Sequence, residues 1–233
     1  MDELIHREAS SPNWDERALP VSMVVLHYTG MPSAADALER MVDPKTKVSA
    51  HYMIDEDGTV TRLVPENKRA WHAGRSFWRG ISDVNSASLG IELVNPGHEW
   101  GYRPFPEAQM EALIPLLAAI RDRHDVSLAN IVGHSDVAPA RKEDPGELFE
   151  WDLLARYGLA VKRPKPRISL LYDEPSAFFL ALERYGYDIA DGHAAIRAFQ
   201  RRWRPRIIDG ELDGEIGALL FELLLQEDLG HDM

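Results

Sequence analysis

The 233-residue chain contains no cysteine. This absence excludes a disulfide framework and every metal site built on thiolates. Any bound metal ion must therefore be held by histidine nitrogens and carboxylate oxygens. Long hydrophobic runs are missing as well, since none approaches the roughly 18 apolar residues that a membrane-spanning helix needs. We expect no membrane insertion.

Basic residues are in the minority: 26 Lys and Arg stand against 38 Asp and Glu, which gives a formal net charge of −12. Such a surface repels phosphate backbones and anionic bilayers, so we expect no nucleic-acid partner. Residues 1–20 are polar and acidic and lack the apolar stretch of a signal peptide. The sequence predicts a cytoplasmic protein if Met1 is the natural start, and a periplasmic one if the N-terminus is a processed form.

Residues 162–167 alternate proline with basic residues, which predicts a stiff linker between two domains. In residues 1–161, strand-like and helix-like segments alternate, which indicates an α/β fold with a mixed central β-sheet flanked by helices. Residues 168–233 predict a small three-helix domain. The expected segments are strands at 23–27, 51–54, 59–64, 89–94 and 130–134, helices starting at Ser33 and Pro106, and C-terminal helices at 176–185, 193–203 and 213–225.

Two histidines lie at the ends of predicted buried strands, where α/β folds build their sites. They are His27 and His134. Asp144 follows ten residues after His134, in a loop that carries Pro139 and can turn back on itself. Two histidines and one carboxylate leave a fourth zinc position open for water, as hydrolytic rather than structural zinc sites do. We therefore expect one zinc ion per chain.

A hydrolytic site also needs a base and a group that stabilises an oxyanion. Glu92 is a charged residue inside an apolar strand, where burial would raise its pKa towards a range useful for proton transfer. Lys142 lies two residues before Asp144 and could stabilise a developing oxyanion. The alternative is that Glu92 pairs with an arginine and that Lys142 is a surface charge.

Five ordered motifs carry a resemblance to a known family. They are VLHYT at 25–29, SAHY at 49–52, WHAG at 71–74, LGIELVN at 89–95, and the segment 133–146. Residues 20–160 resemble the zinc N-acetylmuramoyl-L-alanine amidases, a family that is itself similar to amidase-type phage lysozymes and peptidoglycan recognition proteins. The resemblance implies hydrolysis of the amide between N-acetylmuramic acid and L-alanine in peptidoglycan fragments. By motif, His27, His134 and Asp144 resemble the zinc ligands, Glu92 the residue that activates water, and Lys142 the one that stabilises the oxyanion.

Four further residues are candidates for substrate binding. His51 and His72 are expected in the cleft without metal contact, although a third zinc histidine and a hydrogen-bonded supporting role are the alternatives. Trp71 offers an apolar face for a sugar ring or a peptide. Asn95 could hydrogen-bond the stem peptide.

The segments 185–187, 195–200 and 209–213 resemble a small peptidoglycan-binding domain. The alternative is that this part has become a packing or dimerisation module. The five chemical residues all precede the linker, which predicts a first domain that performs the chemistry alone.

Three other functions compete with a recycling amidase. One is a peptidoglycan sensor on the same fold that lacks catalysis, which should lack a ligand or the Glu–Lys pair. Another is a zinc peptidase, although the helical HExxH motif is absent. The third is an amidase that acts on intact periplasmic wall. We expect recycled muropeptides, of the anhydro-sugar kind, as the substrate.

Overall fold

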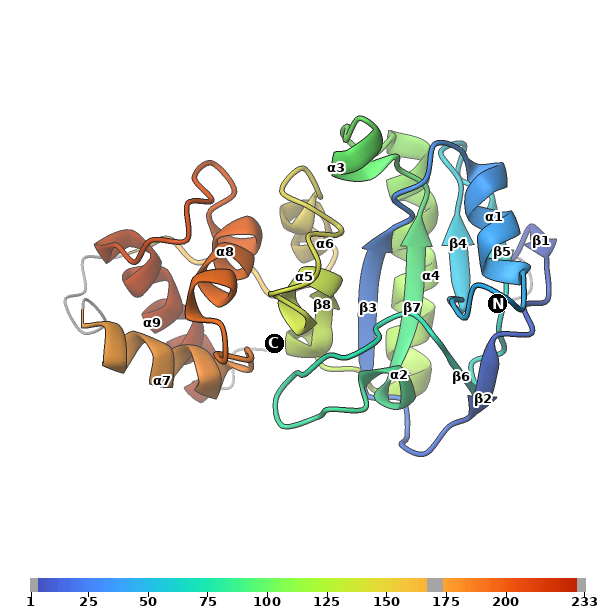
Figure 1. Ribbon diagram of the computed structural model, residues 1–233. Helices are drawn as coiled ribbons and strands as arrows, with labels where there is room; N and C mark the ends of the chain where they lie inside the picture. The colour runs from blue at the N-terminus through green and yellow to red at the C-terminus, as the bar shows by residue number, and fades with distance from the viewer. Residues whose placement is uncertain (1–3, 167–173, 230–233) are drawn as a thin grey trace.

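The computed structural model describes residues 4–166 and 174–229. Figure 1 shows an α/β part beside a C-terminal group of helices. The central sheet has six strands in the order β1-β5-β4-β7-β3-β8. The strands are β1 (Arg7–Glu8), β3 (Met23–Tyr28), β4 (Tyr52–Ile54), β5 (Val60–Arg62), β7 (Ser88–Leu93) and β8 (Ile131–Gly133).

The sheet is mixed, as the sequence predicts. Strands β4 and β5 are antiparallel, whereas β4–β7, β7–β3, β3–β8 and β1–β5 are parallel pairs. Strand β3 lies between β7 and β8, and its residues 23–26 are fully buried. A strand covered on both faces must be apolar along its whole length, which explains its sequence MVVL. A separate ribbon pairs β2 (Trp14–Glu16) with β6 (Lys68–Ala70).

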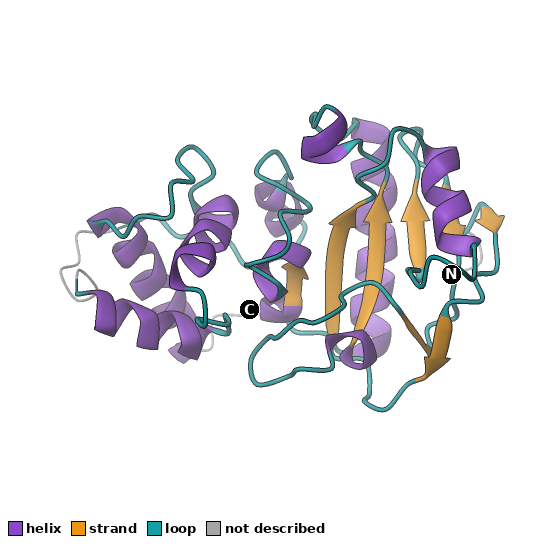
Figure 2. Cartoon of the chain, in the orientation of Figure 1, coloured by secondary structure: helices purple, strands orange, loops and turns teal. Residues whose placement is uncertain are grey.

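Helices cover the sheet, and the 18-residue helix α4 runs along one face of it (Figure 2). Ser33 caps α1 by accepting a hydrogen bond from the Asp36 amide, as expected of a serine before a helix. Pro106 is the N-cap residue of α4 rather than part of its first turn. The helices of this part are α1 (Ala34–Val42), α2 (Val84–Ala87), α3 (Gly97–Trp100), α4 (Glu107–His124), the 3-10 helix Leu128–Asn130, α5 (His134–Val137) and α6 (Trp151–Arg156).

The C-terminal part consists of α7 (Pro175–Tyr185), α8 (Gly192–Trp203) and α9 (Gly214–Asp228). The predicted helices match these within three residues at each end. Asp191 and Asp213 cap α8 and α9 through their side chains. Of the predicted linker, Pro164 is buried and Lys165 is exposed. Arg167 and the expected domain start at residue 168 lie outside the described residues.

The two parts share one apolar core. A continuous cluster of buried side chains joins the sheet residues to those of α7, α8 and α9. At the junction, Trp78 packs edge-on against Tyr187 with ring centroids 5.1 Å apart, and the Arg79 amide donates to the Gly186 carbonyl. Within residues 4–166 and 174–229, no helix is both long and apolar enough to cross a membrane.

Candidate metal centre and active site

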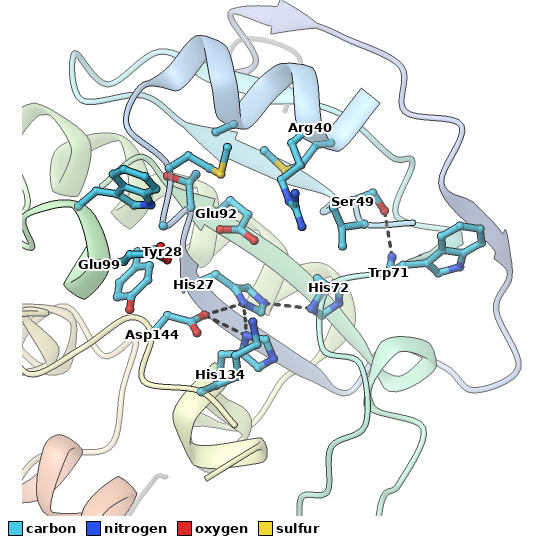
Figure 3. A pocket seen from close by; sticks show the side chains of 18 residues that line it. His27, Tyr28, Arg40, Ser49, Trp71, His72, Glu92, Glu99, His134 and Asp144 are labelled. Atoms are coloured by element: carbon cyan, nitrogen blue, oxygen red, sulfur yellow. Dashed lines mark hydrogen bonds and ion pairs between the residues drawn. The ribbon is translucent and has the colours of Figure 1, made fainter. Parts of the chain in front are cut away.

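Three predicted ligands converge at the carboxyl ends of β3 and β8 (Figure 3). The Nδ1 atoms of His27 and His134 lie 2.9 Å apart, and each lies 3.0 Å from Oδ2 of Asp144. All three residues are buried. With zinc bonds of 2.0–2.1 Å, tetrahedral ligand atoms are about 3.3 Å apart, so these three atoms need only a small outward shift to hold the ion.

The fold brings the ligands together from distant segments. His27 is the penultimate residue of β3, whereas His134 is the first residue of α5, directly after β8. The loop that carries Asp144 returns to this point because the Ser135 amide donates to the Asp144 carbonyl at 2.8 Å. A Cβ on Gly133 would lie 2.7 Å from Cδ of Pro145, so only glycine lets the loop approach β8 this closely.

Hydrogen bonds orient the histidine rings for metal binding. Nε2 of His134 lies 3.1 Å from the Ala73 carbonyl and must donate its proton there, which leaves Nδ1 free as a ligand. Nε2 of His27 lies 3.1 Å from Nδ1 of His72, whose own Nε2 lies 3.3 Å from Oγ of Ser88. If Nε2 of His27 and Nε2 of His72 each carry the proton, both hydrogen bonds are formed, and Nδ1 of His27 is again left unprotonated.

The electrostatics favour the metal-binding protonation states. Burial and the nearby His134 lower the pKa of His27 to about 4, although Asp144 opposes the shift. Burial alone would raise the pKa of Asp144, but His134 and His27 hold it below its usual range. A neutral imidazole at His27 and an ionised carboxylate at Asp144 are the forms that bind zinc.

Glu92 faces the same pocket from the adjacent strand. It pairs in register with His27 across β7 and β3 (Figure 3). Its Oε2 atom is buried and has no hydrogen-bond partner among the described residues, which argues against the alternative of a structural ion pair. Burial, together with Asp144, raises the pKa of Glu92 well above its usual range, while Lys142 opposes the shift.

Lys142 lines the pocket and is half-buried. Its backbone amide donates to the Ala138 carbonyl at 3.0 Å, so the loop holds the residue in place. Its charge acts on both Glu92 and His27, whose pKa values it lowers. A half-buried lysine in the pocket lining does not fit the alternative of a simple surface charge.

The pocket has a volume of about 500 Å³. Of the four candidate substrate-binding residues, Trp71 and His72 line it. His72 lies in the pocket and contacts His27 rather than the three ligand atoms, which agrees with a cleft position without metal contact and with the alternative of a supporting role. A Cβ on Gly90 would lie 2.5 Å from the His72 ring, so the glycine of the LGIE motif makes room for this histidine.

His51 and Asn95 are not among the residues that line this pocket, and the contacts of His51 fit the alternative of a hydrogen-bonded supporting role. His51 is fully buried, where it accepts from the Gly90 amide and lies 3.0 Å from the Lys68 carbonyl. Asn95 is also fully buried; it donates to the Arg103 carbonyl and accepts from the Gly97 amide. The His51 ring also lies 2.9 Å from Nη2 of Arg17, so it links that arginine to strands β6 and β7, whereas the Asn95 amide ties together the chain after β7.

Three further residues of the pocket were not predicted from the sequence. Arg40 of α1 points its guanidinium into the pocket, opposite Glu92 (Figure 3). Glu99 and the exposed Trp100 of α3 form part of the rim. An arginine in the last turn of an amphipathic helix is ordinary, so no sequence signal marks Arg40 as a pocket residue.

A mixed α/β sheet with a buried two-histidine, one-carboxylate centre and an unpaired glutamate beside it defines the class of metal-dependent hydrolases. The family model described as N-acetylmuramoyl-L-alanine amidase matches residues 17–147. The chain belongs to this family.

Individual relatives agree. The N-acetylmuramoyl-L-alanine amidase AmiD of Escherichia coli K12 is 35% identical over 91% of this chain and 84% of its own length. The 1,6-anhydro-N-acetylmuramyl-L-alanine amidase AmpD of Haemophilus influenzae is 35% identical over 67% of this chain and 92% of its own. A solved complex of E. coli AmiD with anhydro-N-acetylmuramic acid-L-Ala-D-γ-Glu-L-Lys superposes with a TM-score of 0.78, at 33% identity over 94% of each chain.

Proposed function

We propose that this protein is a zinc-dependent N-acetylmuramoyl-L-alanine amidase that hydrolyses the amide between N-acetylmuramic acid and L-alanine in peptidoglycan fragments. His27, His134 and Asp144 hold the single zinc ion. The observation that carries the proposal is the convergence of these three ligand atoms, within 3.0 Å of one another, in a pocket that Glu92 also faces. A sensor without catalysis would have no use for a half-buried glutamate whose Oε2 atom is buried without a hydrogen-bond partner.

The residues divide the reaction between them. A zinc ion held at the centre supplies Lewis-acid polarisation of the scissile carbonyl and of a water molecule. Glu92 accepts a proton as the water oxygen bonds to the carbonyl carbon, and Lys142 stabilises the negative charge that develops on the carbonyl oxygen. Glu92 then returns the proton to the alanine nitrogen as the C–N bond breaks. The products are a lactyl carboxylic acid and a peptide with a free amino terminus.

We infer that small anhydro-muropeptides are the substrate. Support comes from the relative named as a 1,6-anhydro-N-acetylmuramyl-L-alanine amidase and from the solved AmiD complex with an anhydro-muropeptide. Trp71 and Trp100 supply apolar surface for the sugar or the peptide. Such a role belongs to cell-wall recycling, and the cytoplasmic location that the sequence predicts stays a prediction.

Product analysis tests the proposal directly. A defined anhydro-muropeptide and its free stem peptide are incubated separately with the protein, and the products are identified by mass spectrometry. We expect the muropeptide to give the free sugar and the intact peptide, and the stem peptide to remain uncut. Cleavage inside the stem peptide would instead identify a peptidase, and binding without turnover a sensor.

We expect one equivalent of zinc per chain, measured by elemental analysis of protein purified without added metal. Removal by a chelator should lower the melting temperature by about 5 to 10 °C, because a ligand that binds only the folded state stabilises it by about 2.7 kcal/mol at one hundred times its dissociation constant. Asp144→Ala should lose both the metal and the chelator response. A wild-type protein without zinc, equally stable with and without chelator, contradicts the proposed centre.

Arg40→Gln should raise KM about fivefold and leave kcat within about twofold. A γ-linked glutamate in the stem peptide keeps a free α-carboxylate, to which the Arg40 guanidinium could donate a hydrogen bond. The loss of one such charged hydrogen bond at a partly exposed site corresponds to about 1 kcal/mol of binding free energy. Lys45→Gln serves as the control, because Lys45 is an exposed cation outside the pocket lining. Steady-state kinetics is measured for both variants on substrates with and without the glutamate α-carboxylate. A KM of Arg40→Gln equal to that of the wild type on the carboxylate-containing substrate would mean that Arg40 has no role in recognition.

A further inference from the structure

Helix α8 of the C-terminal part contacts the catalytic segments at two points. Arg202 pairs with Asp136, which lies two residues after the ligand His134. Arg201 pairs with Glu143, which lies between Lys142 and the ligand Asp144. Consecutive residues of one helix therefore reach two of the segments that carry the proposed chemistry.

The first contact is a buried charged cluster. The carboxylate of Asp136 accepts from the Gly133 amide at 2.8 Å, from the Tyr187 hydroxyl at 2.6 Å and from the Arg202 guanidinium at 3.3 Å. Its side chain is 1% exposed and that of Arg202 is 5% exposed. Because Gly133 directly precedes His134, this cluster fixes the backbone from which the metal ligand projects.

The cluster belongs equally to both parts of the chain. Arg202 also donates to the Ile131 carbonyl of β8, and its guanidinium lies 3.5 Å from the ring centroid of Trp151. A guanidinium stacked on an aromatic face, with its protons bonded to a carboxylate and a carbonyl, has a fixed orientation. An independent wall-binding module would need no such insertion into the neighbouring fold.

The second contact holds the loop before Asp144. Arg201 donates to Oε1 of Glu143 at 3.1 Å, and Arg197 lies 3.9 Å from the same oxygen. The Arg201 side chain is only 6% exposed, so the guanidinium is fixed by its surroundings, and Glu143 is drawn to it. This pair restrains the residue that separates Lys142 from the metal ligand.

We propose that α8 is a positioning element of the active site: through Arg202–Asp136 and Arg201–Glu143 it holds the two segments that present His134, Lys142 and Asp144. The inference rests on the proposed zinc centre. It replaces the expectation that residues 1–161 perform the chemistry alone. The C-terminal part is then required for metal affinity and turnover, whether or not it also binds peptidoglycan.

The test uses the full chain with Arg201→Gln, Glu143→Gln and the double variant. Arg184→Gln is the matched control, because Arg184 pairs with Asp228 within the C-terminal part. Zinc dissociation constants are measured by competition with a chromophoric chelator. The kinetic constants kcat and KM are measured on a defined muropeptide. Loss of outer contacts to a metal site typically costs about 10- to 100-fold in affinity or activity. Since this pair acts through Asp144, we expect each single variant to show a zinc dissociation constant raised about tenfold.

The kinetic constants separate positioning from general damage. We expect kcat to fall about tenfold with KM within about twofold, and the double variant to be no worse than either single one. Arg184→Gln should match the wild type. Wild-type zinc affinity and kcat in Arg201→Gln and Glu143→Gln would overturn the proposal.

The Arg202–Asp136 contact is tested with a more conservative substitution than Arg202→Met. Arg202→Met would leave the Asp136 carboxylate buried without its cation and can unfold the chain. Tyr187→Phe removes one hydroxyl from Asp136 and conserves the ring. Tyr185→Phe is its control, since that ring lies beside Tyr187 at 6.3 Å. We expect a weaker zinc affinity, by about three- to tenfold, in Tyr187→Phe alone. Equal affinities in the two variants contradict the role of the Asp136 cluster, whereas a wild type that binds no zinc removes the proposed centre itself.

Discussion

Glu92→Gln is expected to lower kcat by about two to four powers of ten while zinc binding is retained, because removal of a general base typically has this effect. Glutamine keeps the size of the side chain but cannot accept a proton. The three proposed ligands lie on other segments, so metal content should not change. Zinc analysis and single-turnover rates on a defined muropeptide measure the two properties separately. Near-wild-type turnover in the zinc-loaded variant would give Glu92 a structural role instead.

The same substitution should stabilise the metal-free protein. The pKa of Glu92 is raised in the folded state, so the folded protein holds this proton more tightly than the unfolded chain does. Stability is therefore lost as the pH rises above the unfolded pKa of the carboxyl group, and at neutral pH the buried group is a net cost. Glu92→Gln removes that cost. A higher melting temperature at pH 7, with no gain at pH 4, is the expected result; lower stability at both pH values would contradict it.

Lys142→Ala is expected to reduce kcat by about two to three powers of ten with little change in KM, by analogy with the loss of one oxyanion donor. The lysine charge favours the tetrahedral oxyanion over the planar amide, so it lowers the barrier more than it tightens substrate binding. Lys142 lines the same pocket as Glu92 and His27, which supports this role.

The control for Lys142→Ala is Lys162→Ala, which removes an exposed cation that does not line the pocket. Zinc content should be equal in both variants, since lysine is not a ligand. Kinetics on one defined muropeptide compares them. A zinc-loaded Lys142→Ala with wild-type kcat would exclude the residue from the mechanism.

The residues that could be predicted from the sequence are those whose role leaves a local pattern. The apolar run before His27 is short and rich in valine, as a buried strand is, so its end is expected at the mouth of the sheet. A glutamate inside the apolar run of β7 is too costly to be accidental. Capping residues such as Ser33 mark helix starts directly. These features depend on a few neighbouring residues, and the structure agrees with them.

Other features depend on contacts that no local pattern records. Strand β1 has two residues, and its hydrogen bonds come from β5, more than 50 positions away. Asn95 is a polar residue after a strand, like a cleft residue, but its amide is used by backbone groups of a later loop. Arg40 enters the pocket because α1 packs over the sheet end. In each case, the environment is set by distant chain segments.

The buried Asp136 also bears on how the protein is made. Its partner Arg202 lies 66 residues further along the chain. At about 5 to 20 residues per second, a ribosome needs roughly 3 to 13 seconds to add that segment. During this interval the sheet can form, but the carboxylate beside His134 still lacks its cation and must remain in water. The metal-binding end of the nascent sheet is therefore completed only after helix α8 has left the exit tunnel.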